Sequence, residues 1–198
     1  GSGFPALAPL TKLQTLRLAF APVTDAGLQA LGDSKNLKDL DVQGTHITSS
    51  GLAELKKLSG LEQLDLGETQ ITDVGLQSLE GLKQLQELDL SSTKVTDKAL
   101  KHVSHLDQLQ NISLALTGVT DSGLADLAGL KNLGEFYLFR AAVTGTALKN
   151  LTSVPLKKLN LDHTKLTAEG MSAVGKLNNL QELNLNYTST RDDELKDL

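Results

Sequence analysis

Three aspartates at a constant spacing are the first residues of this sequence that could do chemistry. Asp41, Asp65 and Asp89 lie 24 residues apart, each between two aliphatic residues. Like charges that face one another across a sheet repel, so a cation or a basic side chain would stabilise them. We therefore predict an acidic patch for a Lys/Arg-rich partner. A secondary interpretation is Ca²⁺, which prefers several carboxylate oxygens, and the plainest is that the carboxylates are merely solvated. The predicted patch comprises Asp39, Asp41, Asp65, Glu68, Glu87 and Asp89.

Aromatic residues suggest a second kind of site. The chain has only four Phe and two Tyr, yet "FYLFR" places Tyr137, Phe139 and Arg140 within four positions. Tyr and Arg are favoured anchors of interfaces, and leaving Phe139 in water forgoes roughly 1.5–3 kcal/mol of burial energy. We predict a partner-binding surface here; the alternative is a local packing irregularity. Its predicted members are Tyr137, Phe139, Arg140, Leu116, His163, Tyr187 and Phe20.

Catalytic chemistry finds little support. There is no Cys, and the histidines lack the paired spacing of a zinc site. Asp162 beside His163 hints at a triad, but no G-x-S-x-G turn accompanies it. "GETQITD" lacks the Gly-Lys pair of a phosphate loop. We predict a protein that is not an enzyme and has neither a metal site nor a cofactor.

Composition restricts the partners and the compartment. The formal net charge of -5 disfavours nucleic acid and anionic membranes, which attract clustered Lys and Arg. No apolar run approaches the roughly 20 residues of a membrane span, and no signal peptide is recognisable. The absence of Cys excludes disulfides and favours the cytoplasm, although bacterial surface proteins also lack Cys. We therefore expect a protein or peptide partner and leave the localisation open.

A repeated unit must position these residues. Each copy begins with Leu, continues as L-x-x-L-x-L, and ends with leucines at helical spacing. The alternation predicts a short strand and the later leucines a helix. Thr72 or Asp73 would cap that helix, and small residues such as Gly75 would let it lie close to the strand. Copies begin at Leu13, Leu37, Leu61, Leu85, Leu109, Leu133, Leu156 and Leu180.

The position within the unit predicts which side chains are exposed. Side chains alternate across a strand, so the third, fifth and seventh positions should face solvent, with the eighth at the rim. These positions contain all the residues predicted above to bind a partner or a cation. The ninth position is usually Thr, as in Thr45 and Thr69, with Ala21 and Ala141 as departures. We expect the Thr hydroxyls to satisfy backbone groups of the loops.

The unit L-x-x-L-x-L-x-x-T-x-[VI]-T-D-x-G-L-x-x-L-x-x-L resembles leucine-rich repeats, in a Thr variant of the cysteine-containing type. Similar units occur in bacterial proteins. The resemblance implies a right-handed α/β solenoid with a parallel sheet on its concave face and helices on its convex face. We expect residues 1–198 to form one domain, with a partial repeat at 4–12, as a fragment of a longer protein.

The resemblance implies a non-catalytic module that binds a protein or peptide, possibly basic, on its concave face. Two alternatives remain open. One is a structural spacer in a larger bacterial protein. The other is the substrate-recognition part of an F-box-type ubiquitin ligase, which would need an F-box outside this sequence. Because cut solenoids expose apolar faces, we also expect end-to-end self-association.

Overall fold

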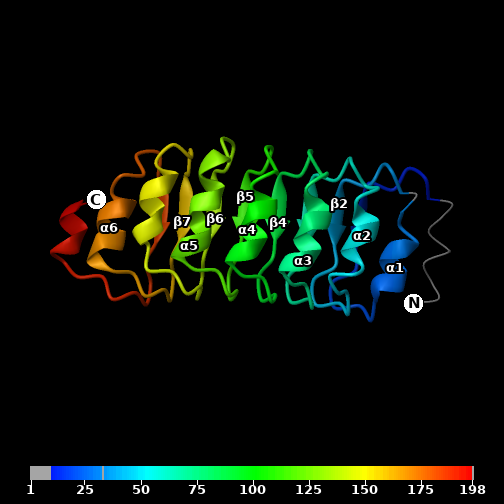
Figure 1. Ribbon diagram of the computed structural model, residues 1–198, viewed down its shortest axis with the longest axis horizontal. Coiled ribbons are helices and arrows are strands. Elements are labelled where there is room, and N and C mark those ends of the chain that lie inside the picture. The colour runs from blue at the N-terminus through cyan, green and yellow to red at the C-terminus, as the bar shows by residue number, and fades with distance from the viewer. Residues whose placement is uncertain (1–9, 33, 198) are drawn as a thin grey trace.

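One parallel sheet dominates the computed structural model, which describes residues 10–32 and 34–197. Within this described part, eight strands pair in chain order, so the chain advances steadily from one end to the other (Figure 1). The strands recur at the spacing of the sequence units. They are β1 (Thr15–Arg17), β2 (Asp39–Asp41), β3 (Gln63–Asp65), β4 (Glu87–Asp89), β5 (Asn111–Ser113), β6 (Glu135–Tyr137), β7 (Lys158–Asn160) and β8 (Glu182–Asn184).

The register of the sheet places equivalent residues side by side. Leu40 pairs with Leu64 and then Leu88, which keeps the middle residue of each strand in the core. Asp41, Asp65 and Asp89 pair in the same way. The predicted row of aspartates on adjacent strands is therefore confirmed.

Short helices cover the opposite side of the sheet and form the front layer in Figure 1. Most span one or two turns, because each unit leaves few residues between its loop and its next strand. The α-helices are α1 (Asp25–Gln29), α2 (Leu52–Leu55), α3 (Asp73–Leu76), α4 (Asp97–Val103), α5 (Asp121–Leu124) and α6 (Ala168–Val174). The 3₁₀ helices are η2 (Gln77–Leu79), η3 (Ala125–Gly129), η4 (Thr146–Leu151) and η5 (Glu194–Asp197).

The core between the sheet and the helices is almost entirely aliphatic. Leu, Ile and Val from both layers are buried in one continuous cluster, and each contributes roughly 1.5–3 kcal/mol. Phe136 takes the place of a core leucine and is fully buried. Leu16 and Leu183, in the first and last described strands, are only partly buried.

Threonines at the ninth position fulfil the predicted structural role. The Thr69 hydroxyl donates to the Leu66 carbonyl at 2.5 Å, and the Thr93 hydroxyl donates to the Leu90 carbonyl at 2.6 Å. Thr45, Thr117, Thr164 and Thr188 make the same contact. Among the described residues, no buried side-chain polar atom lacks a hydrogen-bond partner.

The predicted helix cap is absent at Thr72, but it occurs in two later repeats. There the Thr120 hydroxyl accepts from the Ser122 N–H and the Thr167 hydroxyl from the Gly170 N–H, both at 3.2 Å. Thr72 and Thr96 precede α3 and α4, but neither side chain caps its helix. Asp73 instead crosses to the following repeat, where its carboxylate accepts from the Thr96 N–H at 2.6 Å and the Thr96 hydroxyl at 2.8 Å. Asp25, Asp97 and Asp121 make equivalent bridges to Thr48, Thr120 and Thr144. The Thr–Asp pairs therefore join successive repeats.

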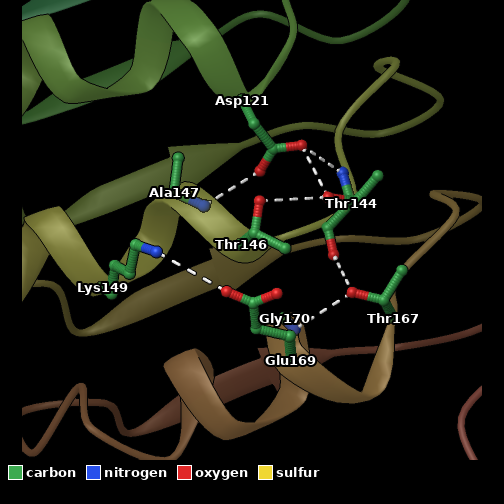
Figure 2. Close-up of polar contacts among 8 residues, drawn as sticks. All are labelled: Asp121, Thr144, Thr146, Ala147, Lys149, Thr167, Glu169 and Gly170. Carbon is green, nitrogen blue, oxygen red and sulfur yellow. Dashed lines mark hydrogen bonds and ion pairs between the residues drawn. The ribbon is translucent and has the colours of Figure 1, made fainter.

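These bridges change along the array. Asp121 also accepts from the Ala147 N–H at 3.0 Å, as Figure 2 shows. In the next repeat Gly145 stands at the Asp position, and the Thr167 N–H donates to the Thr144 carbonyl at 3.1 Å instead. The small residues allow close approach between repeats and not only toward the strand. A Cβ atom on Gly170 would lie 2.1 Å from the Thr144 carbonyl oxygen.

Two sequence-based predictions concern the ends and the membrane. Residues 4–9 of the partial repeat lie outside the described residues, and Leu10 is largely exposed. In the described part of the chain, no helix combines the length and the apolar character needed to cross a membrane.

Candidate functional site

The exposed face of the sheet carries a long groove of about 580 Å³. It extends from Arg17 in β1 to Asn160 in β7, and side chains at the third and fifth positions form most of its lining. Ala115 and Phe139 line it from the seventh position. The residues predicted to face solvent from the sheet therefore share one continuous surface.

The aspartates of the groove have a structural task that the sequence analysis missed. Asp41, Asp65 and Asp89 each accept a hydrogen bond from the backbone N–H two residues later, at 3.0, 2.8 and 2.6 Å. Asn160 and Asn184 do the same in later repeats. A short Asp or Asn side chain before a turn is the sequence signal for this contact. The hydrogen bond accounts for the residue type but leaves the charge uncompensated.

Basic side chains neutralise the carboxylates near the two ends of the groove. Arg17 pairs with Asp39 at 2.8 Å, and Lys158 lies 3.2 Å from Glu135 and 3.8 Å from Glu182. Glu68 accepts from the Gln43 amide at 3.0 Å. Among the described residues, no Lys or Arg pairs with the members of what we call the central acidic patch, Asp41, Asp65, Glu87 and Asp89.

Asp65 lies at the middle of this patch. Burial raises its pKa, and repulsion from Asp89, Asp41 and Glu68 raises it further, while the hydrogen bond from the Gly67 N–H lowers it; the resulting pKa is about 6. A positively charged neighbour at Asp65 would offset the repulsion from the surrounding carboxylates.

The arrangement offers no support for the Ca²⁺ interpretation. Ca²⁺ takes six to eight oxygen ligands. In the part of the chain that the structure describes, no three acidic or histidine side chains converge in a way that could hold a metal ion. The aspartates lie in a row across adjacent strands rather than around a common point.

Three aromatic rings line up where the last strands enter their loops. The ring centroids of Phe139 and His163 are 5.4 Å apart in an edge-to-face arrangement, and those of His163 and Tyr187 are 4.3 Å apart. The Arg140 guanidinium lies 5.2 Å from the Phe139 centroid. Tyr187 has an exposed fraction of 81%. We call Phe139, His163 and Tyr187 the aromatic row.

Tyr137 lies beside the aromatic row and faces the groove. Its hydroxyl donates to a Glu135 carboxylate oxygen at 2.6 Å. That hydrogen bond, together with burial, raises the pKa of Tyr137 to about 12. The same contact and the neighbouring Lys158 lower the pKa of Glu135 despite partial burial. The Tyr137 ring is thus held in a fixed position on the groove wall.

The remaining predicted contacts divide between two places. Leu116 lies next to the aromatic row, because its N–H donates to the Phe139 carbonyl at 2.8 Å, and its side chain is exposed. Phe20 lies at the other end of the array, against Gly44. The structure therefore does not bring Phe20 together with the other predicted aromatic contacts.

Every eighth position has a left-handed backbone conformation, which the sequence analysis did not foresee. Gly44 is the single glycine among them, with φ of 64°. The others are Phe20, Glu68, Ser92, Leu116, Arg140, His163 and Tyr187, with φ between 51° and 58°. Such a conformation costs a non-glycine residue roughly 1–2 kcal/mol.

Three histidines contact a carboxylate or a backbone carbonyl oxygen. His163 Nδ1 contacts Asp162 Oδ1, and His102 Nδ1 contacts Glu80 Oε1 at 2.6 Å on the helical side. His105 Nδ1 lies 2.9 Å from the Lys101 carbonyl oxygen. No hydroxyl group of the described residues hydrogen-bonds with His163, so a nucleophile–histidine–aspartate arrangement is missing from this part of the chain.

Comparisons with known proteins agree with the repeat pattern. Residues 35–95 and 59–118 match a family described as leucine rich repeat. Residues 10–32 and 152–175 match a second family with that description. No curated protein matches the chain.

Solved structures of two internalins from Listeria monocytogenes have the same fold. One internalin is 24% identical with a TM-score of 0.74, over 98% of this chain and 61% of that one. Internalin C2 is 26% identical with a TM-score of 0.67, over 89% of this chain and 82% of that one. This chain thus spans about three fifths of the length of the first internalin.

Proposed function

Because this chain belongs to the leucine-rich-repeat family, we propose that it is a non-catalytic module that binds a protein or peptide partner through the exposed face of its sheet. Solenoids of stacked repeats present extended surfaces of this kind. The internalins share the architecture, and a repeat module for protein interaction is the role that the family suggests.

The groove is the observation that carries this proposal. It crosses seven strands and combines uncompensated carboxylates with the half-buried aromatic side chains of Tyr137 and Phe139. A surface with rigid aromatic anchors and unpaired charges suits a macromolecular partner, because anchors supply contact area and charges supply orientation. We assign the central acidic patch and the aromatic row, with Tyr137, Arg140 and Leu116, to that interface.

The rim favours a binding role over that of a structural spacer. At the eighth position glycine adopts the left-handed conformation without strain, yet seven of the eight repeats carry larger side chains there. Four of these, Leu116, Arg140, His163 and Tyr187, follow one another on consecutive repeats beside Phe139. A spacer has no need of large side chains at a position where they are strained.

A selection experiment tests the proposal. The whole chain is immobilised, random peptides on phage are selected against it, and the bound peptides are mapped on the protein by amide chemical shifts. We expect shifts to concentrate in β3 to β6. Tyr137→Ser with Phe139→Ala should abolish binding, and the folded state should persist because the previous repeat has Ser113 and Ala115 at these positions.

The control is Val74→Ser, which removes an apolar side chain with an exposed fraction of 77% from α3. Peptides that bind equally to both variants would show that the sheet face is not the interface. Peptides that lose binding only with Val74→Ser would place the interface on the helical side and overturn the proposal.

A further inference from the structure

Resting on the proposed function, we infer that the groove recognises an extended peptide segment in which a Lys or Arg lies about three residues from an aromatic or large aliphatic residue. The basic side chain lies on the central acidic patch. The apolar side chain packs against Tyr137 and Phe139.

The first part of this inference rests on where the compensating charges lie. Arg17 and Lys158 already neutralise Asp39 and Glu135 toward the two ends of the groove. The central patch has no basic partner among the described residues, so the groove attracts a cation most strongly at β3 and β4. Burial is the main cause of the raised pKa of Asp65, and repulsion from Asp89, Asp41 and Glu68 adds to it. A partner cation thus has one preferred place along the groove.

The second part rests on the apolar wall. Tyr137 and Phe139 line the groove at β6 and its loop. The hydrogen bond from Tyr137 to Glu135 fixes the tyrosine ring. The His163 ring packs edge-to-face with the Phe139 ring. Rigid aromatic walls provide contact area at little entropic cost, so a partner's apolar residue would bind here. The adjoining carboxylate of Glu135 is neutralised by Lys158 and does not disfavour that residue.

Small side chains line the groove between the central acidic patch and Tyr137. Between Asp89 and Tyr137 the row of paired fifth-position residues contains only Ser113. The hydroxyl oxygens of Ser91 and Ser113 lie 2.6 Å apart, and Ala115 follows on the same strand. These small side chains leave space for a peptide backbone above the sheet, with hydroxyl groups within its reach.

The spacing follows from the sheet. Asp89 and Tyr137 are two strands apart, which corresponds to roughly 10 Å at about 4.8 Å per strand. A peptide in the polyproline II conformation advances about 3.1 Å per residue, so three residues cover about 9 Å. This conformation has three residues per turn, so residues three apart lie on the same side. The segment therefore runs across the strands in this conformation, with its basic and apolar residues both facing the groove.

Two synthetic peptides test the inference by fluorescence polarisation with the whole chain. One is acetyl-Gly-Ser-Lys-Ser-Ser-Phe-Ser-Gly-amide, which has the required spacing. The other, acetyl-Gly-Ser-Lys-Phe-Ser-Ser-Ser-Gly-amide, has the same composition with adjacent Lys and Phe. We expect roughly tenfold tighter binding of the first peptide. Equal affinities, or no measurable binding of either peptide, overturn the inference.

Variants of the protein separate the two halves of the site. With Asp65→Asn and Asp89→Asn together, the preference for Lys over norleucine in the first peptide should disappear, while binding through Phe remains. Asn at this position keeps the backbone hydrogen bond, as Asn160 and Asn184 show. An unchanged preference for Lys overturns the inference.

The phage selection distinguishes this inference from the proposed function. Enrichment of the basic–apolar spacing among peptides that map to the sheet face supports both. Peptides that map to the sheet face without that spacing leave the proposed function intact and overturn only the inference. Peptides that map to the helical face overturn both.

Discussion

Asp121 binds both the backbone N–H and the hydroxyl of Thr144 in the following repeat, at 2.6 and 2.9 Å (Figure 2). The carboxylate thereby satisfies a loop N–H that no strand pairing reaches. Since Asp25, Asp73 and Asp97 make the same contact, polar bridges and apolar stacking together connect the repeats.

Replacing Asp121 by Ala should destabilise the protein by about 2–3 kcal/mol, because the Thr144 and Ala147 N–H groups lose a charged acceptor. Urea unfolding followed by circular dichroism measures the change. Asp121→Ser should lose less, since Ser49 occupies this position in the second repeat and accepts from the Thr72 N–H at 3.0 Å. The exposed Asp107→Ala is the control and should leave the free energy of unfolding unchanged. Equal stability of wild type and Asp121→Ala would contradict the role of the bridge.

The stabilisation by Asp121 should depend on pH. Burial raises its pKa, but the hydrogen bonds from Thr144 and Ala147 outweigh that effect and hold the pKa below the ordinary 3.8. A lowered pKa in the folded state gives stability that is present above about pH 4 and is lost as the pH falls further. The difference between wild type and Asp121→Ala should therefore narrow in urea titrations below pH 4. A difference that stays constant down to the lowest accessible pH would contradict the assignment.

Asp65→Asn should show the opposite behaviour. The pKa of Asp65 is raised to about 6 in the folded protein, so its stabilising contribution is complete below about pH 4 and is lost as the pH rises through 6. The variant keeps an acceptor for the Gly67 N–H, and its melting temperature should exceed that of wild type at pH 8 but match it at pH 4. Solvent screening makes the gain smaller than the pKa shift alone implies. For the control Asp107→Asn, the plot of melting temperature against pH should run parallel to that of wild type. A parallel plot for Asp65→Asn would refute the prediction.

Thr93→Ala should cost roughly 1 kcal/mol, because the buried Leu90 carbonyl loses a hydrogen bond from the Thr93 hydroxyl. Thr93→Ser retains the hydroxyl and should recover most of the loss. Thermal unfolding of the two variants and of the exposed Thr152→Ala measures these differences. If Thr93→Ser were as unstable as Thr93→Ala, packing of the Thr methyl group would be the cause instead.

Ser92→Gly should stabilise the protein by about 0.5–1 kcal/mol. Glycine removes the strain of the left-handed conformation at φ 56°, which is roughly 1–2 kcal/mol. Part of this gain is offset because glycine loses more conformational entropy on folding than serine does. Ser172→Gly, within α6, is the matched substitution and should destabilise by about 0.5 kcal/mol. Opposite signs for the two variants in urea unfolding would support the strain at the eighth position. Destabilisation by both would argue against it.

The sequence sufficed for the strands, their register and the core, because one unit repeats at a nearly constant spacing. Phe136 occupies a leucine position of the unit and is buried accordingly, and Asp41 lies beside Asp65 as the spacing predicts. The predicted cap at Thr72 or Asp73 is absent for a physical reason. An Asp next to a Thr can bond within its own helix or across to the next repeat, and spacing within one unit does not distinguish these. That the repeats bind a partner stays a prediction.

The left-handed rim could not be predicted from residue types. Leu116, Arg140 and Tyr187 are not residues that favour this conformation, so only the backbone of the assembled array reveals it. Phe139, His163 and Tyr187 of the aromatic row were all among the predicted contacts, but the contacts between their rings follow only from the assembled array. The ion pair between Arg17 and Asp39 joins the exposed sheet faces of two adjacent repeats. It follows from the alignment of the repeats once the register of the strands is known.

The shared geometry of the rim has a consequence for engineering. Eight residues, one from each repeat, have nearly the same φ. In six of the repeats the neighbouring Thr hydroxyl bonds to a backbone carbonyl of the loop. A library randomised at these eight positions would alter the displayed side chains while leaving the leucine lattice untouched. The array is thereby suited to grafting, with each repeat acting as an exchangeable display position at a fixed pitch.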